Sequence, residues 1–138
     1  MRANDVALLI LRLTMAVVIW PHGAQKTLAW FGGPGLAGVI AGLHGNMGIP
    51  LPLVYLVIAA EFLAPIALVL GILTRLAAIG IAIDMVTAAV LVHARNGFFM
   101  NFSGKQSGEG VEFFILLAGI GLTLAIAGPG RIAVMKRF

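Results

Sequence analysis

The chain contains no cysteine, and only 10% of its 138 residues carry a charge. Without thiols, the chain itself cannot form disulfides, thiol relays, Cys-ligated zinc sites or iron–sulfur clusters. A redox role would therefore need a bound cofactor, a metal held by nitrogen and oxygen ligands, or a partner protein. The shortage of charge also argues against a soluble domain, in which about a quarter of the residues are charged.

Apolar residues make up 61% of the sequence, and the mean hydropathy is +1.08. So short a chain cannot hide that much apolar surface in one water-soluble core, which makes the lipid bilayer the natural solvent and partner. We predict an all-α integral membrane protein: a four-helix antiparallel, up-and-down bundle that forms a single transmembrane domain over residues 1–138. Its spans are about 5–30, 52–73, 76–93 and 111–127. Residues 36–44 are too short to span and predict an interfacial or re-entrant segment between helices 1 and 2.

The net charge of +4 reflects basic residues at the ends of the apolar runs. No basic face is interleaved with aromatic residues, so nucleic acid is not an expected partner. Four spans place Arg2, Arg75, Arg131, Lys136 and Arg137 on one side of the membrane, and Lys26, Arg95 and Lys105 on the other. The positive-inside rule then predicts a multi-pass membrane protein with both termini in the cytoplasm.

Three ionisable residues fall inside the predicted spans: Arg12, Glu61 and Asp84. Charges in hydrocarbon are costly, so we expect Arg12 to form a buried ion pair with one of the two carboxylates. We favour Glu61, because Pro65 has no N–H and frees the backbone carbonyl of residue 61. This pair would be either a device that fixes helix register or part of a ligand or proton path.

A second polar group lies toward the outer end of the predicted bundle. His22 and Lys26 are one helical turn apart, and we expect Lys26 to contact Glu112, with simple snorkelling of Lys26 as the alternative. Asp84 and His93 are nine residues apart and point about 180° apart on a straight helix, so both can face one site only if the helix breaks. The candidate ligand-binding residues are His22, Gln25, Lys26, His93, Asn96 and Glu112.

Two other kinds of site are not expected. His22, His44, His93 and Glu112 lack a local metal-ligand spacing such as H-x-x-x-H, so we assign no metal site. The stretch from Gly33 to Gly38 matches G-x-G-x-x-G, but a membrane helix precedes it where a dinucleotide-binding motif needs a strand.

The sequence resembles the DoxX family of small bacterial membrane proteins along nearly its whole length. The resemblance rests on Leu11-Arg12-Leu13, Pro21-His22-Gly23, Gln25-Lys26, the run from Trp30 to Leu36, Gly48-Ile49-Pro50, Ala60-Glu61, the run from Gly71 to Arg75, His93, the run from Asn96 to Phe99, Glu112, and the run from Gly128 to Arg131. It implies a four-helix inner-membrane protein. Relatives in this family include membrane subunits of thiosulfate:quinone oxidoreductase, and others accompany redox or stress enzymes. Asp84 is not part of the family pattern.

The resemblance implies a membrane subunit or partner of a redox system that binds a quinone or lipid at the outer polar cluster. An enzymatic role would be at most that of a quinone-linked oxidoreductase subunit, with a quinone as the candidate cofactor and a redox protein as the candidate partner. Two alternatives stay open: a small transporter or proton path through Arg12, Glu61 and Asp84, which four spans would support only as a homo-oligomer, and a non-enzymatic membrane scaffold.

Overall fold

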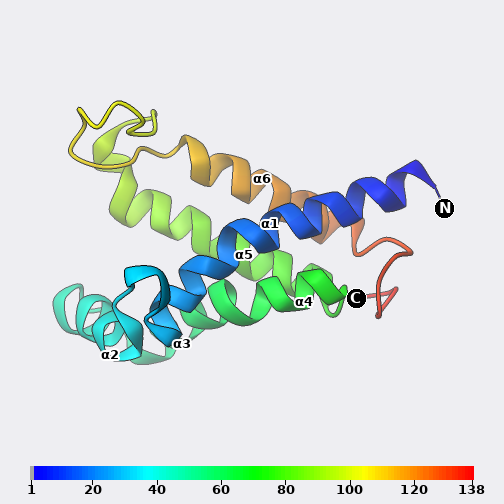
Figure 1. Cartoon of the computed structure of the whole chain (residues 1–138), viewed down its shortest axis with the longest axis horizontal. Helices are drawn as coiled ribbons and strands as arrows, with labels where there is room; N and C mark the ends of the chain where they lie inside the picture. Colours follow the sequence, from blue (N-terminus) through cyan, green and yellow to red (C-terminus); the bar gives the residue numbers. More distant parts are fainter. Residues whose placement is uncertain (1) are drawn as a thin grey trace.

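The computed structural model describes residues 2–138, and these residues form helices and loops without a strand (Figure 1). Three helices are interrupted or extended by π-helical segments, which are η2, η3 and η4, while η1 and η5 are short 3₁₀ turns. The elements in chain order are α1 (Ala3–Leu28), η1 (Trp30–Gly32), α2 (Gly35–Val39), η2 (Ile40–Asn46), α3 (Leu51–Ile58), η3 (Ala59–Leu63), α4 (Ala64–Leu70), α5 (Thr74–Ala88), η4 (Ala89–His93), η5 (Ala94–Asn96) and α6 (Glu112–Ala127).

These elements confirm an all-α membrane protein. Three helical runs are long and apolar enough to cross a bilayer: Ala3–Leu28, Leu51–Leu70 and Thr74–Asn96. The fourth, α6, has 16 residues and is about 24 Å long, shorter than the ~30 Å hydrocarbon core. The turn between the second and third runs differs slightly from expectation. It lies at 71–73, where Gly71 and Leu73 are left-handed, and Thr74 already begins α5.

The four runs pack in a closed ring. Helix α1 contacts η3 and α4, α4 contacts α5, α5 contacts α6, and α6 returns to α1. Both chain ends lie at the end of the bundle where α4 stops, which we call the terminal end; η2 and the 97–111 loop lie at the opposite, loop end (Figure 1). A buried cluster around Met15, Ile19, Leu68 and Ile81 fills the middle. This arrangement puts the predicted polar groups inside one bundle.

Small side chains allow α5 and α6 to pack closely. A Cβ added at Gly121 would lie 2.9 Å from both the Ala78 carbonyl oxygen and the Ala82 Cβ. Residues 78 and 82 are four apart and so form one stripe of α5. Helices in lipid gain no hydrophobic free energy by packing against each other, so van der Waals contact between closely packed backbones supplies much of their attraction.

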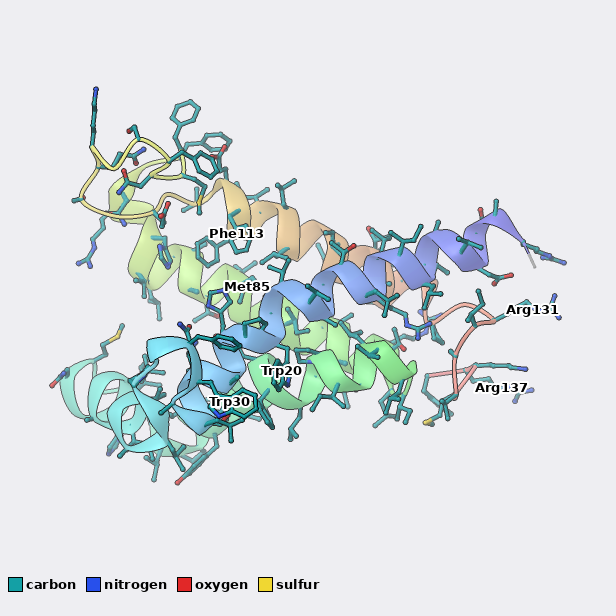
Figure 2. The ribbon with its side chains drawn as sticks, in the orientation of Figure 1. Trp20, Trp30, Met85, Phe113, Arg131 and Arg137 are labelled. Atoms are coloured by element: carbon teal, nitrogen blue, oxygen red, sulfur yellow. The ribbon has the colours of Figure 1, made fainter. Side chains whose placement is uncertain are left out.

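The C-terminal segment after α6 closes the terminal end. The Arg131 N–H donates to the Asp5 carboxylate at 3.0 Å, and the Val134 N–H donates to the Leu70 carbonyl at 3.1 Å. Asp5 also accepts a hydrogen bond from the Arg2 N–H at 3.1 Å, which caps α1. The side chains of Arg131 and Arg137 point outward at this end (Figure 2). The terminal end is thus a hydrogen-bonded closure with a basic outer surface.

That basic surface carries a prediction about orientation. We expect a cytoplasm-active reporter fused after Phe138 to be active and a periplasm-active one to be silent, because positively charged ends are retained in the cytoplasm. Paired fusions in the 97–111 loop are the control and should give the opposite result. A periplasmic signal from the Phe138 fusion would reverse the orientation.

Candidate functional site

A cavity of about 430 Å³ lies inside the loop end of the bundle. This volume falls within the range that small-molecule sites occupy. Its walls are mostly apolar, and they include Met85 and Phe113, which are labelled in Figure 2. The titratable side chains that line it come from α1, η3, α5, η4 and the 97–111 loop; they are His22, Lys26, Glu61, Asp84, His93 and Glu109. An apolar chamber with a few convergent polar groups is the usual form of a ligand site.

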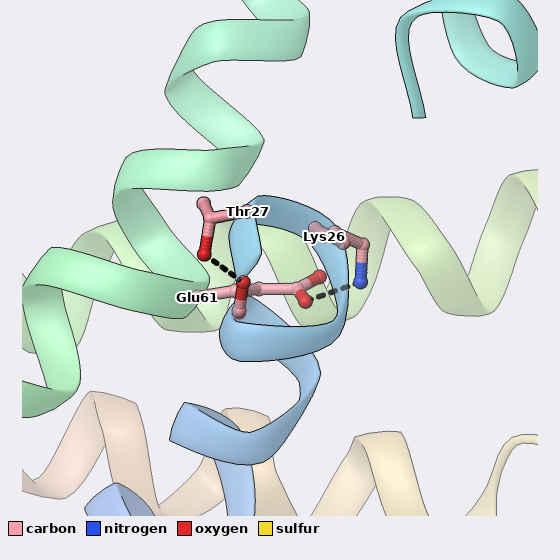
Figure 3. Close-up of polar contacts among 4 residues, drawn as sticks. Lys26, Thr27 and Glu61 are labelled. Atoms are coloured by element: carbon pink, nitrogen blue, oxygen red, sulfur yellow. Dashed lines mark hydrogen bonds and ion pairs between the residues drawn. The ribbon is translucent and has the colours of Figure 1, made fainter. Parts of the chain in front are cut away.

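The central polar feature of this cavity is an ion pair between Lys26 and Glu61 (Figure 3). The Lys26 ammonium donates to Glu61 Oε2, and the Glu61 residue is only 7% exposed. Lys26 therefore points into the bundle and does not snorkel outward. Since an unpaired carboxylate is costly in such a place, Lys26 makes the burial of Glu61 tolerable.

Local backbone features bring these two side chains together. Pro65 lacks an N–H, so the Glu61 carbonyl loses its α-helical partner, and the chain forms the π-helical segment η3 around Glu61. Gly23 of α1 lies directly against this region, and a Cβ at Gly23 would overlap the Glu61 carbonyl group. One turn beyond Gly23, Lys26 then reaches the Glu61 side chain. The Thr27 hydroxyl donates to the Gly23 carbonyl of the same helix at 2.8 Å (Figure 3).

Asp84 contributes a second carboxyl group to the same cavity. It is 8% exposed, and its Oδ2 atom has no hydrogen-bond partner within residues 2–138. The side chain lies within electrostatic reach of both Glu61 and Lys26. A buried polar atom without a partner is rare and needs an explanation. Here the Asp84 side chain lines the cavity, and its carboxyl group lies beside that of Glu61.

His93 reaches this cavity because α5 does not continue as a regular α-helix. The π-helical segment η4 runs from Ala89 to His93, so the phase between Asp84 and His93 changes and both residues line the cavity. The interruption of the regular α-helix that both residues need in order to face one site is therefore present at η4. His93 Nδ1 bonds the Glu109 carbonyl at 3.0 Å, and its ring stacks on Phe114 with centroids 4.3 Å apart. These contacts fix the imidazole.

The six candidate ligand-binding residues divide into two groups. His22, Lys26 and His93 line the cavity, whereas Gln25, Asn96 and Glu112 do not. Asn96 donates to the Glu109 carbonyl at 2.9 Å, and Glu112 accepts from the Met100 N–H at 2.8 Å. The expected contact between Lys26 and Glu112 is therefore replaced by the Lys26–Glu61 pair. Asn96 and Glu112 instead hold the 97–111 loop against the ends of α5 and α6.

The expected pair of Arg12 with a carboxylate is also replaced. Arg12 is 1% exposed, and its guanidinium donates to four backbone carbonyls. The acceptors are Leu68 and Val69 in the last turn of α4, and Pro129 and Ile132 in the C-terminal segment. Carbonyls at a helix C-terminus lack intrahelical partners and attract cations. The first turns of α1 project beyond α4, so Arg12 is level with the end of α4 and not with Glu61.

Several lining residues carried no strong signal in the sequence. Glu109 belongs to a polar loop, and its backbone carbonyl, not its side chain, orients His93 and Asn96. Leu43 and Met47 come from the segment between the first two spans. Two adjacent aromatic residues at the start of α6, Phe113 and Phe114, could have been noticed as a candidate wall. Such residues become part of a site only when segments far apart in the sequence pack together.

Comparisons with known proteins point in one direction. The sequence model of the DoxX family matches residues 7–94. The inner membrane protein YphA of Escherichia coli (strain K12) is 29% identical over 140 residues, which cover 98% of this chain and 92% of YphA. A protein of Bacillus subtilis (strain 168) named "Putative oxidoreductase CatD" is 24% identical over 133 residues, which cover 96% of this chain and 87% of that protein. No solved structure matches the chain with comparable significance.

Proposed function

This chain belongs to the DoxX family of membrane proteins, and from that premise we propose that it is a membrane subunit or partner of a redox system that holds a quinone-type ring in its loop-end cavity. The observation that carries the proposal is the cavity itself, which is apolar in its walls and has the Lys26–Glu61 pair, Asp84 and His93 on its lining. The name of the Bacillus subtilis relative, which describes an oxidoreductase, supports the redox part.

The cavity chemistry suits a flat ring with polar oxygens. Met85, Phe113 and Phe114 offer apolar and aromatic surfaces for the ring. Lys26 has three N–H donors, and the Glu61 carboxylate accounts for one of them, so donors remain for a ligand oxygen. An isoprenoid tail needs only an apolar exit, which lipid-facing helices provide. Shape, polarity and location in the bilayer therefore agree with a quinone.

A proton path through Arg12, Glu61 and Asp84 is the weaker alternative. Arg12 caps α4 at the terminal end, while Glu61 and Asp84 line the cavity at the loop end. Between them lie the fully buried apolar side chains of Met15 and Leu68. These side chains belong to a packed apolar cluster, and protons need a chain of polar groups or water to cross one.

The proposal predicts that cavity variants lose copurified quinone. We expect His22→Ala and Lys26→Ala each to lower the quinone bound per folded protein by about 10-fold, the equivalent of losing roughly 1.4 kcal/mol of binding. The measurement is mass spectrometry of an organic extract of the purified full chain, normalised to the monodisperse protein peak.

Two matched variants serve as controls. His44 does not line the cavity, and Lys105 lies exposed in the 97–111 loop, so His44→Ala and Lys105→Ala should retain wild-type quinone. If all four variants retain it, or if the wild-type protein carries none, the cavity is not a quinone site and a scaffold role becomes the better description.

A further inference from the structure

A groove of about 480 Å³ lies between α1 and α4 and opens to the outside of the bundle. Its buried lining includes the short side chains of Ala16 and Pro65, and its exposed rim includes Val17 and Val69. Trp20, labelled in Figure 2, also lines it. Every lining residue is apolar or aromatic. Because the core of a bilayer holds no water, hydrocarbon has to fill such a hollow.

The groove reaches the terminal end of the bundle. Its lining on α4 runs from Pro65 to Leu70, the last residue of that helix, over a length of about 8 Å. The Leu70 carbonyl accepts from the Val134 N–H at 3.1 Å, and the Gly71 carbonyl accepts from the Met135 N–H at 3.0 Å. These two bonds place the C-terminal segment where the groove ends.

Two exposed cations follow directly on those bonds, Lys136 and Arg137, and the Arg137 side chain points outward (Figure 2). Within residues 2–138, no ion pair involves either of them. The acidic side chain at this end, Asp5, is 6% exposed and already accepts from two backbone N–H groups. Lys136 and Arg137 are therefore available to a phosphate group, for which both side chains are usual ligands.

We infer that this surface binds an anionic phospholipid, with an acyl chain in the groove between α1 and α4 and the phosphate on Lys136 and Arg137. The lipid would join α1, α4 and the C-terminal segment, the three elements that Arg12 also joins. The inference is independent of the proposed quinone site, because the groove and the cavity share no lining residue.

The cations predict which lipid is preferred. The groove by itself accepts any hydrocarbon chain, whereas a basic residue near the membrane surface strengthens the binding of anionic lipid by about five-fold. With two such residues, we expect phosphatidylglycerol to be preferred over zwitterionic phosphatidylcholine by about 10-fold or more at low salt. High salt should weaken this preference, since it screens exposed charges.

The experiment uses Trp20 as a reporter for the groove. The chain has two tryptophans, and Trp30→Phe leaves Trp20 as the only one while keeping an aromatic ring beside it. The full-length Trp30→Phe protein is reconstituted in phosphatidylcholine vesicles that contain phosphatidylglycerol as the minor lipid. One of the two lipids carries bromines in the middle of its acyl chains, and the quenching of Trp20 fluorescence is titrated. Brominated phosphatidylglycerol should quench at about 10-fold lower mole fraction than brominated phosphatidylcholine.

Paired charge variants of this reporter protein test the head-group site. Replacing Lys136 and Arg137 together with glutamine should reduce the preference for phosphatidylglycerol to about 2-fold or less, because both phosphate ligands are lost. Replacing Arg95 and Lys105, which are exposed at the loop end, makes the same change in net charge and should leave the preference intact.

A second pair of variants tests the groove. Val69 is 46% exposed on the rim, so Val69→Phe narrows the groove without overpacking the core. It should weaken quenching by phosphatidylglycerol about 4-fold or more, the effect of losing one buried methylene. Val86 is exposed on α5 outside the groove, and Val86→Phe should behave as the parent protein.

Three results would overturn the inference. Equal quenching by the two brominated lipids at low salt would mean that the groove holds bulk lipid without selectivity. Absence of quenching by either lipid would mean that protein, such as a second copy of the chain, covers the groove. A preference that survives in both the Lys136/Arg137 variant and the Val69→Phe variant would place the lipid on another face. The first two comparisons need no change in the site, so they do not depend on the folding of its variants.

Discussion

Replacing Arg12 with methionine is expected to remove most of the stability of this protein. The substitution leaves the carbonyl oxygens of Val69, Pro129 and Ile132 without the Arg12 donor, whereas the Leu68 carbonyl keeps the Gly71 N–H at 3.2 Å. Each unsatisfied buried carbonyl costs about 1–3 kcal/mol, so the total for three is on the order of 3 kcal/mol or more. Because folded proteins are stable by only about 5–15 kcal/mol, the apparent melting temperature in detergent should fall sharply. Fluorescence-detected size-exclusion chromatography after heating measures it.

Two comparisons make this prediction specific. Arg75 caps α6 in a similar way, by donating to the Ala125 and Ile126 carbonyls at 2.6 Å, but it is exposed to solvent. Arg75→Met should therefore cost less than Arg12→Met, since water can replace the lost donors. Arg12→Lys should rescue only partly, because one ammonium cannot span four acceptors. An Arg12→Met protein as stable as Arg75→Met would contradict the capping role.

The same variant tests which partner Arg12 has. If Arg12 neutralised a carboxylate, Glu61→Gln or Asp84→Asn would relieve the damage of Arg12→Met. In the structure neither carboxylate bonds Arg12, so the destabilisations should simply add.

Gly23→Ala is expected to produce the second large effect. The new Cβ would overlap the carbonyl group of Glu61 and the Cα of Phe62, all of which belong to the backbone of η3. Side-chain rotation cannot relieve such a clash, so α1 must move away from η3. Overpacking costs about 1–3 kcal/mol in ordinary cores, and we expect the upper part of that range here. The movement would also separate Lys26 from Glu61 and lower copurified quinone.

Another helical glycine provides the matched control. A Cβ at Gly80 in α5 would meet no atom within 4 Å, so Gly80→Ala has room for its methyl group. It should be neutral or slightly stabilising, because alanine is favoured over glycine in a helix by about 1 kcal/mol. Equal thermal stability of the Gly23→Ala and Gly80→Ala proteins would show that α1 does not depend on close approach to η3.

The long helices of this protein can be predicted from its sequence, because hydropathy and the residues that end helices together mark them. Long apolar runs separated by Gly, Pro and polar residues predict the four runs with boundaries close to those of the structure. The pairing of charges cannot be predicted in this way. When depth is counted from the end of each apolar run, Arg12 falls near the two carboxylates. In the structure α1 extends beyond α4, so Arg12 lies at the end of α4 and Lys26, not Arg12, pairs with Glu61.

The candidate site, too, could be predicted from the sequence only in part. His22, Lys26 and His93 are expected at one place because of their position along the spans, and all three line the cavity. The requirement for a break between Asp84 and His93 follows from helix geometry, but the π-helical form of that break does not. Pro65 accompanies the π-helical segment η3, but the sequence of η4, Ala-Val-Leu-Val-His, contains no proline and carries no comparable local signal.

The Arg12 cap has a consequence for how the protein is made. Two of its acceptors, Pro129 and Ile132, follow Arg12 by 117 and 120 residues. At a synthesis rate of roughly 5–20 residues per second, the ribosome reaches Pro129 about 6–23 s after Arg12. Throughout that interval the first helix holds a guanidinium whose contacts with the C-terminal segment have not yet been translated. The nascent chain must therefore keep Arg12 at the lipid–water boundary or within the insertion machinery, and assembly is completed only when the C-terminal segment arrives.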